Sequence, residues 1–226
     1  MAEIAGDHAA LMDSVYRKQR YIYDFTRKYY LFGRDRLIAE LAARPGASIV
    51  EIGCGTARNL IKMARLYPHT FFYGLDASEE MLTTARQAVA RAGLSSRIHL
   101  AHGFAEELSP AMFGRAEPFD GAVFSYSLSM IPDWKQALKS ASSALAKNGE
   151  IHIVDFGDLT GLGAIGGKVL RAWLKIFHVS PRVEILRRLE AVKVGTNRKN
   201  GLLTLLPGRY AFLWRSGSEP IQHLMQ

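Results

Sequence analysis

Short apolar runs alternate with longer segments of helical periodicity through the middle of the chain. Strands that alternate with helices in this way are typical of an α/β fold, in which a mostly parallel sheet has helices on both faces. The sequence therefore predicts such a sheet between residues 48 and 157. The expected strands are 48–53, 70–76, 97–103, 119–127 and 150–157, and the expected helices are 56–67, 78–92 and 133–146.

Both ends of the chain break this rhythm. Residues 15–42 read as a helical N-terminal preface, which Pro45 and Gly46 end. A long helical region is expected over 164–194, and residues 202–216 hold two apolar runs about a Pro-Gly pair, the pattern of an antiparallel hairpin. We predict one domain over 1–226, divided into a helical substrate or lid region (1–44), a cofactor-binding core (45–160) and a basic helical segment with the hairpin (161–226).

Composition limits the class of protein. At 226 residues and 48% hydrophobic content, the chain resembles an ordinary single globular domain. The lone cysteine, Cys54, has no partner for a disulfide, and no Cys or His spacing indicates a metal site, so we expect a reducing compartment and no metal. The N-terminus has no basic and apolar regions of a secretion signal, and no window is long and apolar enough to span a membrane. We therefore expect a cytoplasmic protein.

The net charge of +8 is concentrated in two segments. Residues 14–36 carry seven bases and two acids, and residues 167–199 carry nine bases and two acids, whereas 37–166 carry eleven bases and thirteen acids. No signature of an RNA- or DNA-binding module accompanies these bases, so we expect no nucleic-acid partner. The basic segments therefore need another explanation.

A membrane surface is one such explanation. In 168–178, Lys168 and Arg171 begin a basic helical face, and Val169, Leu170 and Leu174 fall on an apolar face. A helix of this kind can lie in a membrane interface, but the pattern equally fits a helix that packs on the core with its basic side in solvent. The segment 16–36, with seven bases, five tyrosines and two phenylalanines, favours the interfacial interpretation.

The stretch SIVEIGCGTARNL, which starts at Ser48, predicts a ligand at a tight turn. Gly53 and Gly55 lie between a strand and a helix, where backbone N–H groups can approach a ligand closely, although such glycines also serve positive φ alone. Asp76 ends the next strand, where a carboxylate can accept both ribose hydroxyls. Glu51 would repel a pyrophosphate but attract an ammonium or a sulfonium. S-adenosylmethionine carries these cations beside a ribose, so we expect it as the cofactor.

Five stretches are similar to motifs of the class I S-adenosylmethionine-dependent methyltransferases: VEIGCGTARNL, GLDASEEML, HGFAEEL, FDGAVFSYSLSMI and ALAKNGEIHIVDF. They cover 48–156 in the order of that family, and the resemblance implies its Rossmann-like fold. The family commonly has Gly where this chain has Ala57. The resemblance places Glu51, Gly53 and Gly55 at the methionine moiety, Asp76 at the ribose, Ala77 and Met81 beside adenine and ribose, Gly103, Phe104 and Ala105 at the adenine border, and Ser125 and Tyr126 near the methyl group.

The N-terminal stretch YRKQRYIYDFTRKYYLFGRDRLI and the turn GCGTARNL further resemble the bacterial betaine-lipid enzymes that N-methylate diacylglycerylhomoserine. This resemblance implies an amino-lipid substrate that becomes a trimethylated betaine lipid in three transfers. It also implies a peripheral location on the inner face of the membrane, an anionic membrane surface as partner, and the enzyme that makes diacylglycerylhomoserine as a candidate associate.

The transfer itself asks for an aligned neutral amine more than for a dedicated base. Aromatic rings can stabilise a methylated ammonium by cation–π attraction, and the candidates are Tyr23, Tyr29, Tyr30 and Tyr126. Three alternatives stay open at this point: a phosphatidylethanolamine N-methyltransferase, a soluble quinone or small-amine methyltransferase, and a non-catalytic scaffold of the same fold.

Overall fold

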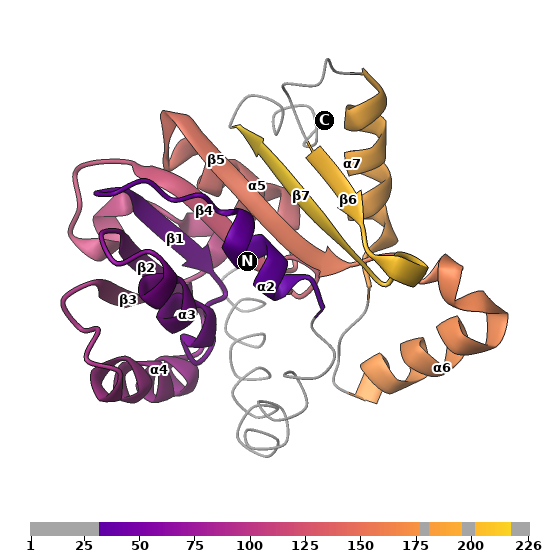
Figure 1. The fold of residues 1–226 in the computed structure, drawn as a ribbon, viewed down its shortest axis with the longest axis horizontal. Helices are drawn as coiled ribbons and strands as arrows, with labels where there is room; N and C mark the ends of the chain where they lie inside the picture. Colours follow the sequence, from indigo (N-terminus) through magenta and orange to yellow (C-terminus); the bar gives the residue numbers. More distant parts are fainter. Residues whose placement is uncertain (1–31, 177–180, 196–201, 218–226) are drawn as a thin grey trace.

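The computed structural model describes residues 32–176, 181–195 and 202–217. One seven-stranded sheet runs through them in the order β3-β2-β1-β4-β5-β7-β6 (Figure 1). Strands β1 to β5 pair in parallel, and β7 is antiparallel to both β5 and β6, which confirms the mostly parallel sheet and the C-terminal hairpin. The strands are β1 (Ser48–Ile52), β2 (Phe71–Asp76), β3 (Ile98–His102), β4 (Phe119–Ser125), β5 (Leu145–Phe156), β6 (Leu202–Leu205) and β7 (Ala211–Gly217).

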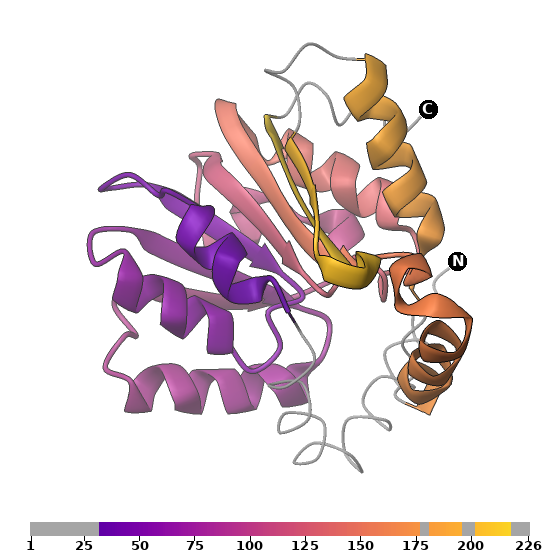
Figure 2. The ribbon, with the colours of Figure 1, turned by 45° about the vertical axis from the view of Figure 1, so that its right-hand side comes forward.

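Helices cover both faces of this sheet (Figure 2). One face carries α2 (Arg34–Glu40), α3 (Arg58–Leu66) and α4 (Glu79–Arg91), and the other carries α5 (Trp134–Ser143) and α7 (Val183–Gly195). Helix α6 (Gly163–Ile176) projects from the body beyond the carboxyl ends of the parallel strands (Figure 1). Short 3₁₀ turns are η1 (Ala105–Glu107), η2 (Pro110–Phe113), η3 (Thr160–Leu162) and η4 (Pro207–Arg209).

Burial on both faces explains why the central strands read as continuous apolar runs. Side chains alternate between the faces of a strand, so Ile49 joins the core under α3 and α4, whereas Val50 and Ile52 join the core under α5 and α7. All five residues of β1 are buried, including the polar Ser48 and Glu51. A buried carboxylate in the central strand marks its carboxyl end as a site of interest.

Two element boundaries differ from the sequence-based expectation. The helix expected over 133–146 ends at Ser143, because Leu145 already pairs with Phe119 as the first residue of β5. The single helical region expected over 164–194 is two helices, α6 and α7, with Pro181 outside both. Proline lacks an N–H and its ring clashes with the preceding turn, so a regular helix is not expected to run through Pro181.

The N-terminal preface is only partly within the described residues. Of the helix expected over 15–42, the described part starts at Phe32 and contains α2, whose Leu37 and Ile38 pack into the core. Residues 15–31 lie outside the described residues. The division of the chain at 44 and 160 stays a prediction, because a single sheet crosses both core and C-terminal region.

Candidate active site

The turn between β1 and α3 is held by the end of β2. The N–H groups of Gly53 and Cys54 both donate to the carbonyl of Leu75, at 2.8 and 3.0 Å. Both glycines of the turn have positive φ, +74° at Gly53 and +53° at Gly55. A Cβ at Gly53 would come within 2.5 Å of Ser127 Cβ, whereas a Cβ at Gly55 would have no atom within 4 Å. Gly53 thus permits packing against the end of β4, and Gly55 faces open space.

Asp76 joins three loops at the carboxyl edge of the sheet. Its Oδ2 accepts the N–H of Gly55 at 2.7 Å, and its Oδ1 accepts the N–H of Ser78 at 3.0 Å. Its carbonyl accepts the N–H of Gly103 at 3.0 Å. The predicted ribose ligand and the predicted glycine loop are therefore in direct contact, and the segment after β3 is attached to the same residue.

Glu51 brings a second carboxylate to this turn. Its side chain is 1% exposed, and Oε1 accepts the amide of Asn59 at 2.7 Å. Sequence reasoning missed Asn59, although it stands in the quoted motif, eight residues after Glu51. Burial raises the pKa of the neighbouring Cys54 thiol well above its usual range, and the charges of Asp76 and Glu51 raise it further. The turn is thus an electronegative place that suits a cation.

Ala57 occupies the position where the family commonly has glycine. Its φ is +61°, in the left-handed region that favours glycine, and it is the N-cap residue immediately before α3. Its methyl group is fully buried, and its N–H donates to the carbonyl of Cys54 at 3.0 Å. The extra carbon therefore points into the core and not toward the open side of the turn.

The residues predicted at the adenine side differ in their exposure to solvent. Ala77 and Phe104 are half-buried, and Ala105 is buried. Met81 is 4% exposed within the core cluster, so in this structure its side chain packs between elements. A Cβ at Gly103 would displace the terminal methyl of the Met112 side chain, which is flexible enough to move. Their contact with adenine stays a prediction.

The end of β4 lies beside the glycine turn. Ile52 pairs with Phe124, and the hydroxyl of Ser127 donates to the Ile52 carbonyl at 2.6 Å. Ser125 is buried, and its hydroxyl has no hydrogen-bond partner among the described residues. A buried hydroxyl of this kind can serve a ligand that enters the site.

Tyr126 is buried, whereas an aromatic side chain that contacts a substrate would be open to the site. It is 1% exposed, its φ is +55°, and its ring packs edge-on against Phe156 with centroids 4.7 Å apart. Its hydroxyl donates to the carbonyl of Phe32, which ties the N-terminal region to β4. Burial raises the pKa of this phenol well above its usual range, so the hydroxyl stays protonated. Its catalytic role stays a prediction, and Tyr23, Tyr29 and Tyr30 lie outside the described residues.

The geometry fits S-adenosylmethionine. Open space in front of Gly55 would receive the methionine moiety, and the two carboxylates of Glu51 and Asp76 suit its positive charges and its ribose. The bound cofactor supplies an electrophilic methyl group on sulfur. In the described parts of the chain, no group of three or more His, Cys, Asp or Glu side chains is arranged to hold a metal ion.

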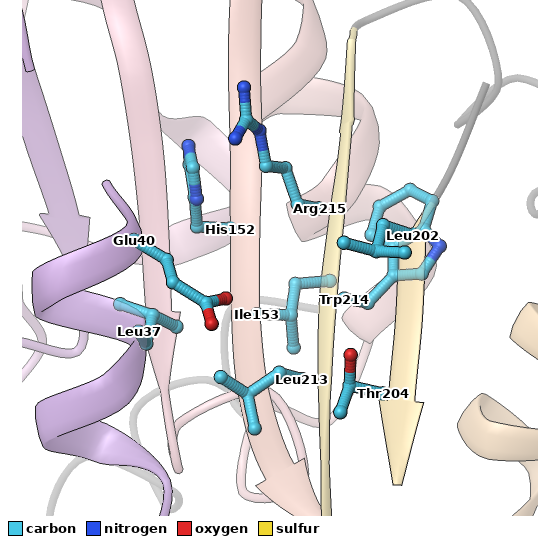
Figure 3. A pocket seen from close by; sticks show the side chains of 9 residues that line it. All are labelled: Leu37, Glu40, His152, Ile153, Leu202, Thr204, Leu213, Trp214 and Arg215. Carbon is cyan, nitrogen blue, oxygen red and sulfur yellow. The ribbon is translucent and has the colours of Figure 1, made fainter. Parts of the chain in front are cut away.

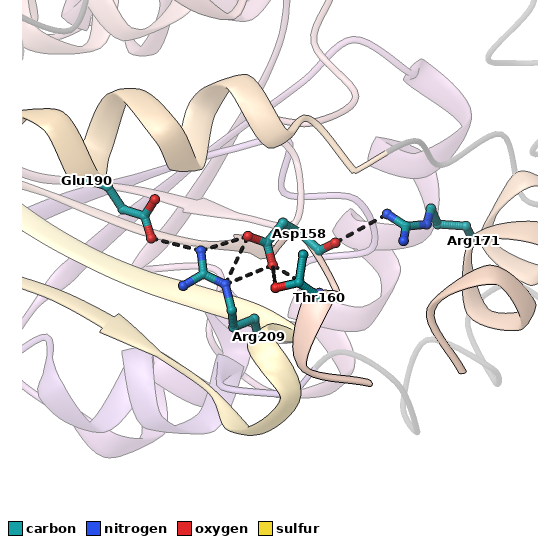
Figure 4. A network of polar contacts seen from close by, with 5 residues as sticks. All are labelled: Asp158, Thr160, Arg171, Glu190 and Arg209. Carbon is teal, nitrogen blue, oxygen red and sulfur yellow. Dashed lines mark hydrogen bonds and ion pairs between the residues drawn. The ribbon is translucent and has the colours of Figure 1, made fainter. Parts of the chain in front are cut away.

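A network of charged groups lies where α6 leaves the sheet (Figure 4). Arg209 forms ion pairs with Asp158 at 2.7 Å and with Glu190 at 2.8 Å. The Asp158 carboxylate also accepts the N–H and hydroxyl of Thr160, and its carbonyl accepts a bond from Arg171 of α6 at 3.2 Å. Arg209 holds the pKa of Asp158 well below its usual range. The network fixes the start of α6 to α7 and to the hairpin.

A separate pocket lies between α2 and strands β5, β7 and β6 (Figure 3). None of the predicted cofactor residues lines it. Near it Glu150 pairs with Arg215 at 2.8 Å and lies 3.4 Å from His152, and these partners lower the pKa of Glu150 to about 2. The lining residues are Leu37, Glu40, His152, Ile153, Leu202, Thr204, Leu213, Trp214 and Arg215.

Comparison with known proteins agrees with this geometry. A family model described as a methyltransferase domain matches residues 49–149. A phosphatidylethanolamine N-methyltransferase of Cereibacter sphaeroides is 32% identical in an alignment of 206 positions, which covers 86% of this chain and 97% of that protein. A demethylmenaquinone methyltransferase of Listeria monocytogenes is 30% identical over 129 residues, 57% of this chain and 52% of that protein.

A solved structure shares the fold. The crystal structure of a SAM-dependent methyltransferase from Aquifex aeolicus matches with a TM-score of 0.58 and 13% identity, over 84% of this chain and 92% of that one. At this identity the likeness concerns the fold alone. The sequence matches, the shared fold and the geometry of the cofactor turn agree, and the chain therefore belongs to the class I S-adenosylmethionine-dependent methyltransferases.

Proposed function

We propose that this methyltransferase acts on the primary amine of a membrane lipid, and that its substrate is diacylglycerylhomoserine, which three successive transfers convert to the trimethylated betaine lipid. In each transfer the amine lone pair forms a bond to the methyl carbon while the carbon–sulfur bond breaks. S-adenosylhomocysteine leaves, and the new ammonium must lose a proton before the next transfer. The trimethylated product has no lone pair, so the sequence ends there.

The observation that carries this proposal is the surface at the carboxyl edge of the sheet. Three large apolar side chains are exposed there: Phe32 at 59%, Leu162 at 37% and Val169 at 64%. Phe32 packs edge-on against Tyr210, with ring centroids 5.4 Å apart, and Leu162 lies against Gly208 of η4. Apolar groups that stay in water beside an active site are typical of a surface that contacts a lipid or a partner.

Helix α6 adds positive charge to this surface. Gly167 and Leu174 are buried and Leu170 is half-buried, so this side of the helix faces the body. Val169 is exposed next to Lys168 and Arg171, although its spacing placed it with the apolar face. The outward side of α6 thus combines an apolar group with bases. This combination favours a helix that lies against anionic headgroups over a helix whose outward side is only solvated.

One relative favours an amine on a lipid, whereas the demethylmenaquinone methyltransferase of Listeria monocytogenes matches only 57% of this chain. The Cereibacter sphaeroides relative is named for N-methylation of phosphatidylethanolamine, and it matches this chain over nearly its whole length. Both candidate lipids carry two acyl chains and a primary amine, so phosphatidylethanolamine is the second candidate substrate. The headgroups differ in charge and shape, because one ends in a carboxylate-bearing homoserine and the other carries a phosphate.

The location that goes with this proposal is peripheral, on the anionic inner face of the membrane, where the enzyme that makes diacylglycerylhomoserine would be a fitting associate. Within the ranges that the structure describes, no helix has the length and apolar character needed to cross a bilayer. We expect the protein to sediment with anionic vesicles at low salt and to be released as salt screens the contact. The double variant Lys168→Glu with Val169→Ser should bind less, whereas Lys139→Glu on the exposed side of α5 should bind as the wild type does.

The deciding experiment uses S-adenosylmethionine with a deuterated methyl group and a panel of amino-lipids. We expect mono-, di- and trimethylated products of diacylglycerylhomoserine in the mass spectrum, with the partly methylated lipids also accepted as substrates. The rate should rise with pH, because a free amine is mostly protonated at neutral pH and only the neutral form reacts. Label on phosphatidylethanolamine alone would establish the second candidate. Label on a quinone, a protein or RNA, with every amino-lipid unlabelled, would refute the proposal.

A further inference from the structure

Asp155 is a buried carboxylate that is not among the predicted cofactor residues. It lies next to the carboxyl end of β5, and its side chain is 1% exposed. Its Oδ2 accepts the N–H of Ser129 at 2.8 Å, and its Oδ1 accepts the N–H of Phe156 at 2.8 Å. One of its oxygens is therefore committed to its own strand and the other to the loop that follows β4.

Arg182 holds the same loop from the opposite side. Its Nε donates to the carbonyl of Ser129 at 3.0 Å, and its Nη1 donates to the carbonyl of Pro132 at 3.2 Å. The backbone N–H and the backbone carbonyl of Ser129 are thus bound by side chains of opposite charge, from the end of β5 and from the segment before α7. Hydrogen bonds with a charged partner are roughly twice as strong as neutral ones.

The loop held in this way, residues 127–132, leads directly from the predicted methyl-transfer position. It begins at Ser127, whose hydroxyl bonds to Ile52 and whose Cβ fills the space that Gly53 leaves open. Its first half therefore contacts the cofactor turn, and its second half is held by Asp155 and Arg182. A shift of the loop would move the end of β4 relative to the cofactor.

The buried surroundings of Asp155 destabilise its charged form. Burial is the largest influence and raises the pKa of Asp155 to about 6, against the bonds from Ser129 and Phe156 and the charge of Arg182, which lower it. Among the described residues, the charged or titratable groups that act on Asp155 are Arg182 and the phenol of Tyr126. The β7 residue opposite Asp155 is the apolar Phe212. A carboxylate kept in such a place beside an active site is typical of a functional role.

We propose that Asp155, together with Arg182, is a positioning residue for methyl transfer, which holds the loop 127–132 so that the acceptor amine lines up behind the methyl group of the cofactor. The proposal rests on the proposed amine acceptor only for its activity readout. Its structural content, a loop fixed by an ionised carboxylate, can be tested without any acceptor. Alignment matters because reacting atoms displaced by about 1 Å can lose on the order of a hundredfold in rate.

The expected effect on stability separates this role from a structural one. Because the folded-state pKa is raised above the ordinary 3.8, Asp155 contributes stability that is fully present below that value and is lost as pH rises through about 6. At neutral pH, Asp155→Asn removes the cost of the buried charge but keeps only one acceptor for the two N–H groups, so the unfolding temperature should change little while catalysis falls. A residue that served only the fold would lose both together.

The first test is hydrogen–deuterium exchange of the peptide that covers the loop 127–132. At pH 7.5, Asp155→Asn and Arg182→Met should each raise exchange at Ser129 by about tenfold or more over the wild type. At pH 5, where Asp155 of the wild type is mostly protonated, the difference for Asp155→Asn should shrink. Asp133→Asn is the matched control, since its side chain caps α5 just past the loop and asparagine caps equally well. Wild-type exchange in both variants at pH 7.5 would overturn the proposal.

The second test measures turnover on the amino-lipid. Asp155→Asn should lower kcat by about tenfold or more with cofactor affinity within about twofold, and Asp155→Glu should recover part of the rate. If Asp155→Asn does not fold, Arg182→Met decides the matter with the same two readouts. Loss of rate only in proportion to loss of folded protein would overturn the positioning role. A wild type that methylates no amino-lipid would instead refute the proposed substrate, and the exchange result would still decide on the loop.

Discussion

The two sides of the active-site edge are built in different ways. On the cofactor side, the turn after β1 and the end of β2 meet through backbone groups, since the N–H groups of Gly53 and Cys54 both donate to the Leu75 carbonyl. On the other side, which comprises the loop 127–132 and the base of α6 and is the acceptor side in the proposed function, charged side chains join segments that are far apart in the chain, as Arg182 does at the Ser129 carbonyl and Arg209 does at Asp158. One side depends mainly on backbone conformation, and the other depends on charged side chains.

Substitutions on the two sides should therefore have different effects on the site. Backbone N–H groups are present whatever the side chain, so the cofactor side should be sensitive at its glycines and carboxylates and tolerant elsewhere. Charged contacts at the base of α6, such as that of Arg209 with Glu190, lie outside the cofactor turn and can change without removing any of its hydrogen bonds. A fold built in this way can keep one cofactor while its acceptor varies, in agreement with the different substrates named for its relatives.

The largest effect expected on the cofactor side is that of Gly53→Ala. The new Cβ would lie 2.5 Å from Ser127 Cβ at a positive φ, so crowding and backbone strain add up to about 2–4 kcal/mol of lost unfolding free energy. Gly46→Ala is the matched control, because its φ is also positive but nothing lies within 4 Å, and it should cost only about 1 kcal/mol. Urea denaturation measures both, and equal losses would mean that Gly53 serves only its φ.

Gly55→Val should act on the cofactor more than on the fold. A Cβ at this position has no atom within 4 Å, so the side chain would extend into the space assigned to the methionine moiety. We expect affinity for S-adenosylhomocysteine to fall by about tenfold or more, which is about 1.4 kcal/mol. Gly46→Val, with similar backbone strain on the turn before β1, should bind as the wild type does. Equal affinity in the two variants would remove Gly55 from the site.

The same contrast explains what the sequence could reveal. Glu51, Gly53, Gly55 and Asp76 lie within 26 residues and at the ends of consecutive strands, so their spacing predicted a shared site, and the structure brings them together. The order of elements likewise predicted the parallel sheet and the hairpin.

The acceptor side offered no such spacing. The bond from Tyr126 to Phe32 spans 94 residues and that from Arg182 to Ser129 spans 53, and neither pair has a local pattern. Burial of Tyr126 also depends on packing across the chain, which its position at a strand end does not reveal. Asp155 is visible in the sequence as a polar residue near the end of an apolar strand.

On the acceptor side, Arg209→Met should loosen the base of α6. It removes the partner of Asp158, whose side chain is only 15% exposed, and of the more exposed Glu190. We expect a loss of about 1 kcal/mol in unfolding free energy and faster hydrogen exchange at the start of α6. Arg36→Met, which breaks an exposed pair within α2, should cost roughly 0.5 kcal/mol or less. A loss no larger than that of this control would show that the network does not fix α6.

The smallest effect concerns Glu150, which lies on neither side of the active-site edge. Its folded-state pKa of about 2 is below the ordinary 4.5, so the stability it contributes is present above pH 4.5 and is lost as pH falls toward 2. Since the side chain is 37% exposed, solvent reduces the contribution to less than about 1 kcal/mol. Glu150→Gln should flatten this part of the pH dependence of thermal unfolding, and cofactor affinity should not change. An unaltered acid limb would mean that its ion pairs contribute nothing measurable.

The division between a cofactor side and an acceptor side is tested most directly by calorimetric titration of S-adenosylhomocysteine into three proteins: the wild type, Asp76→Ala and Asp155→Asn. We expect Asp76→Ala to weaken binding by roughly 1.5–3 kcal/mol, because a charged acceptor of ribose and turn is lost. We expect Asp155→Asn to bind within about twofold of the wild type. Unchanged affinity in Asp76→Ala, or an equal loss in both variants, would contradict the division.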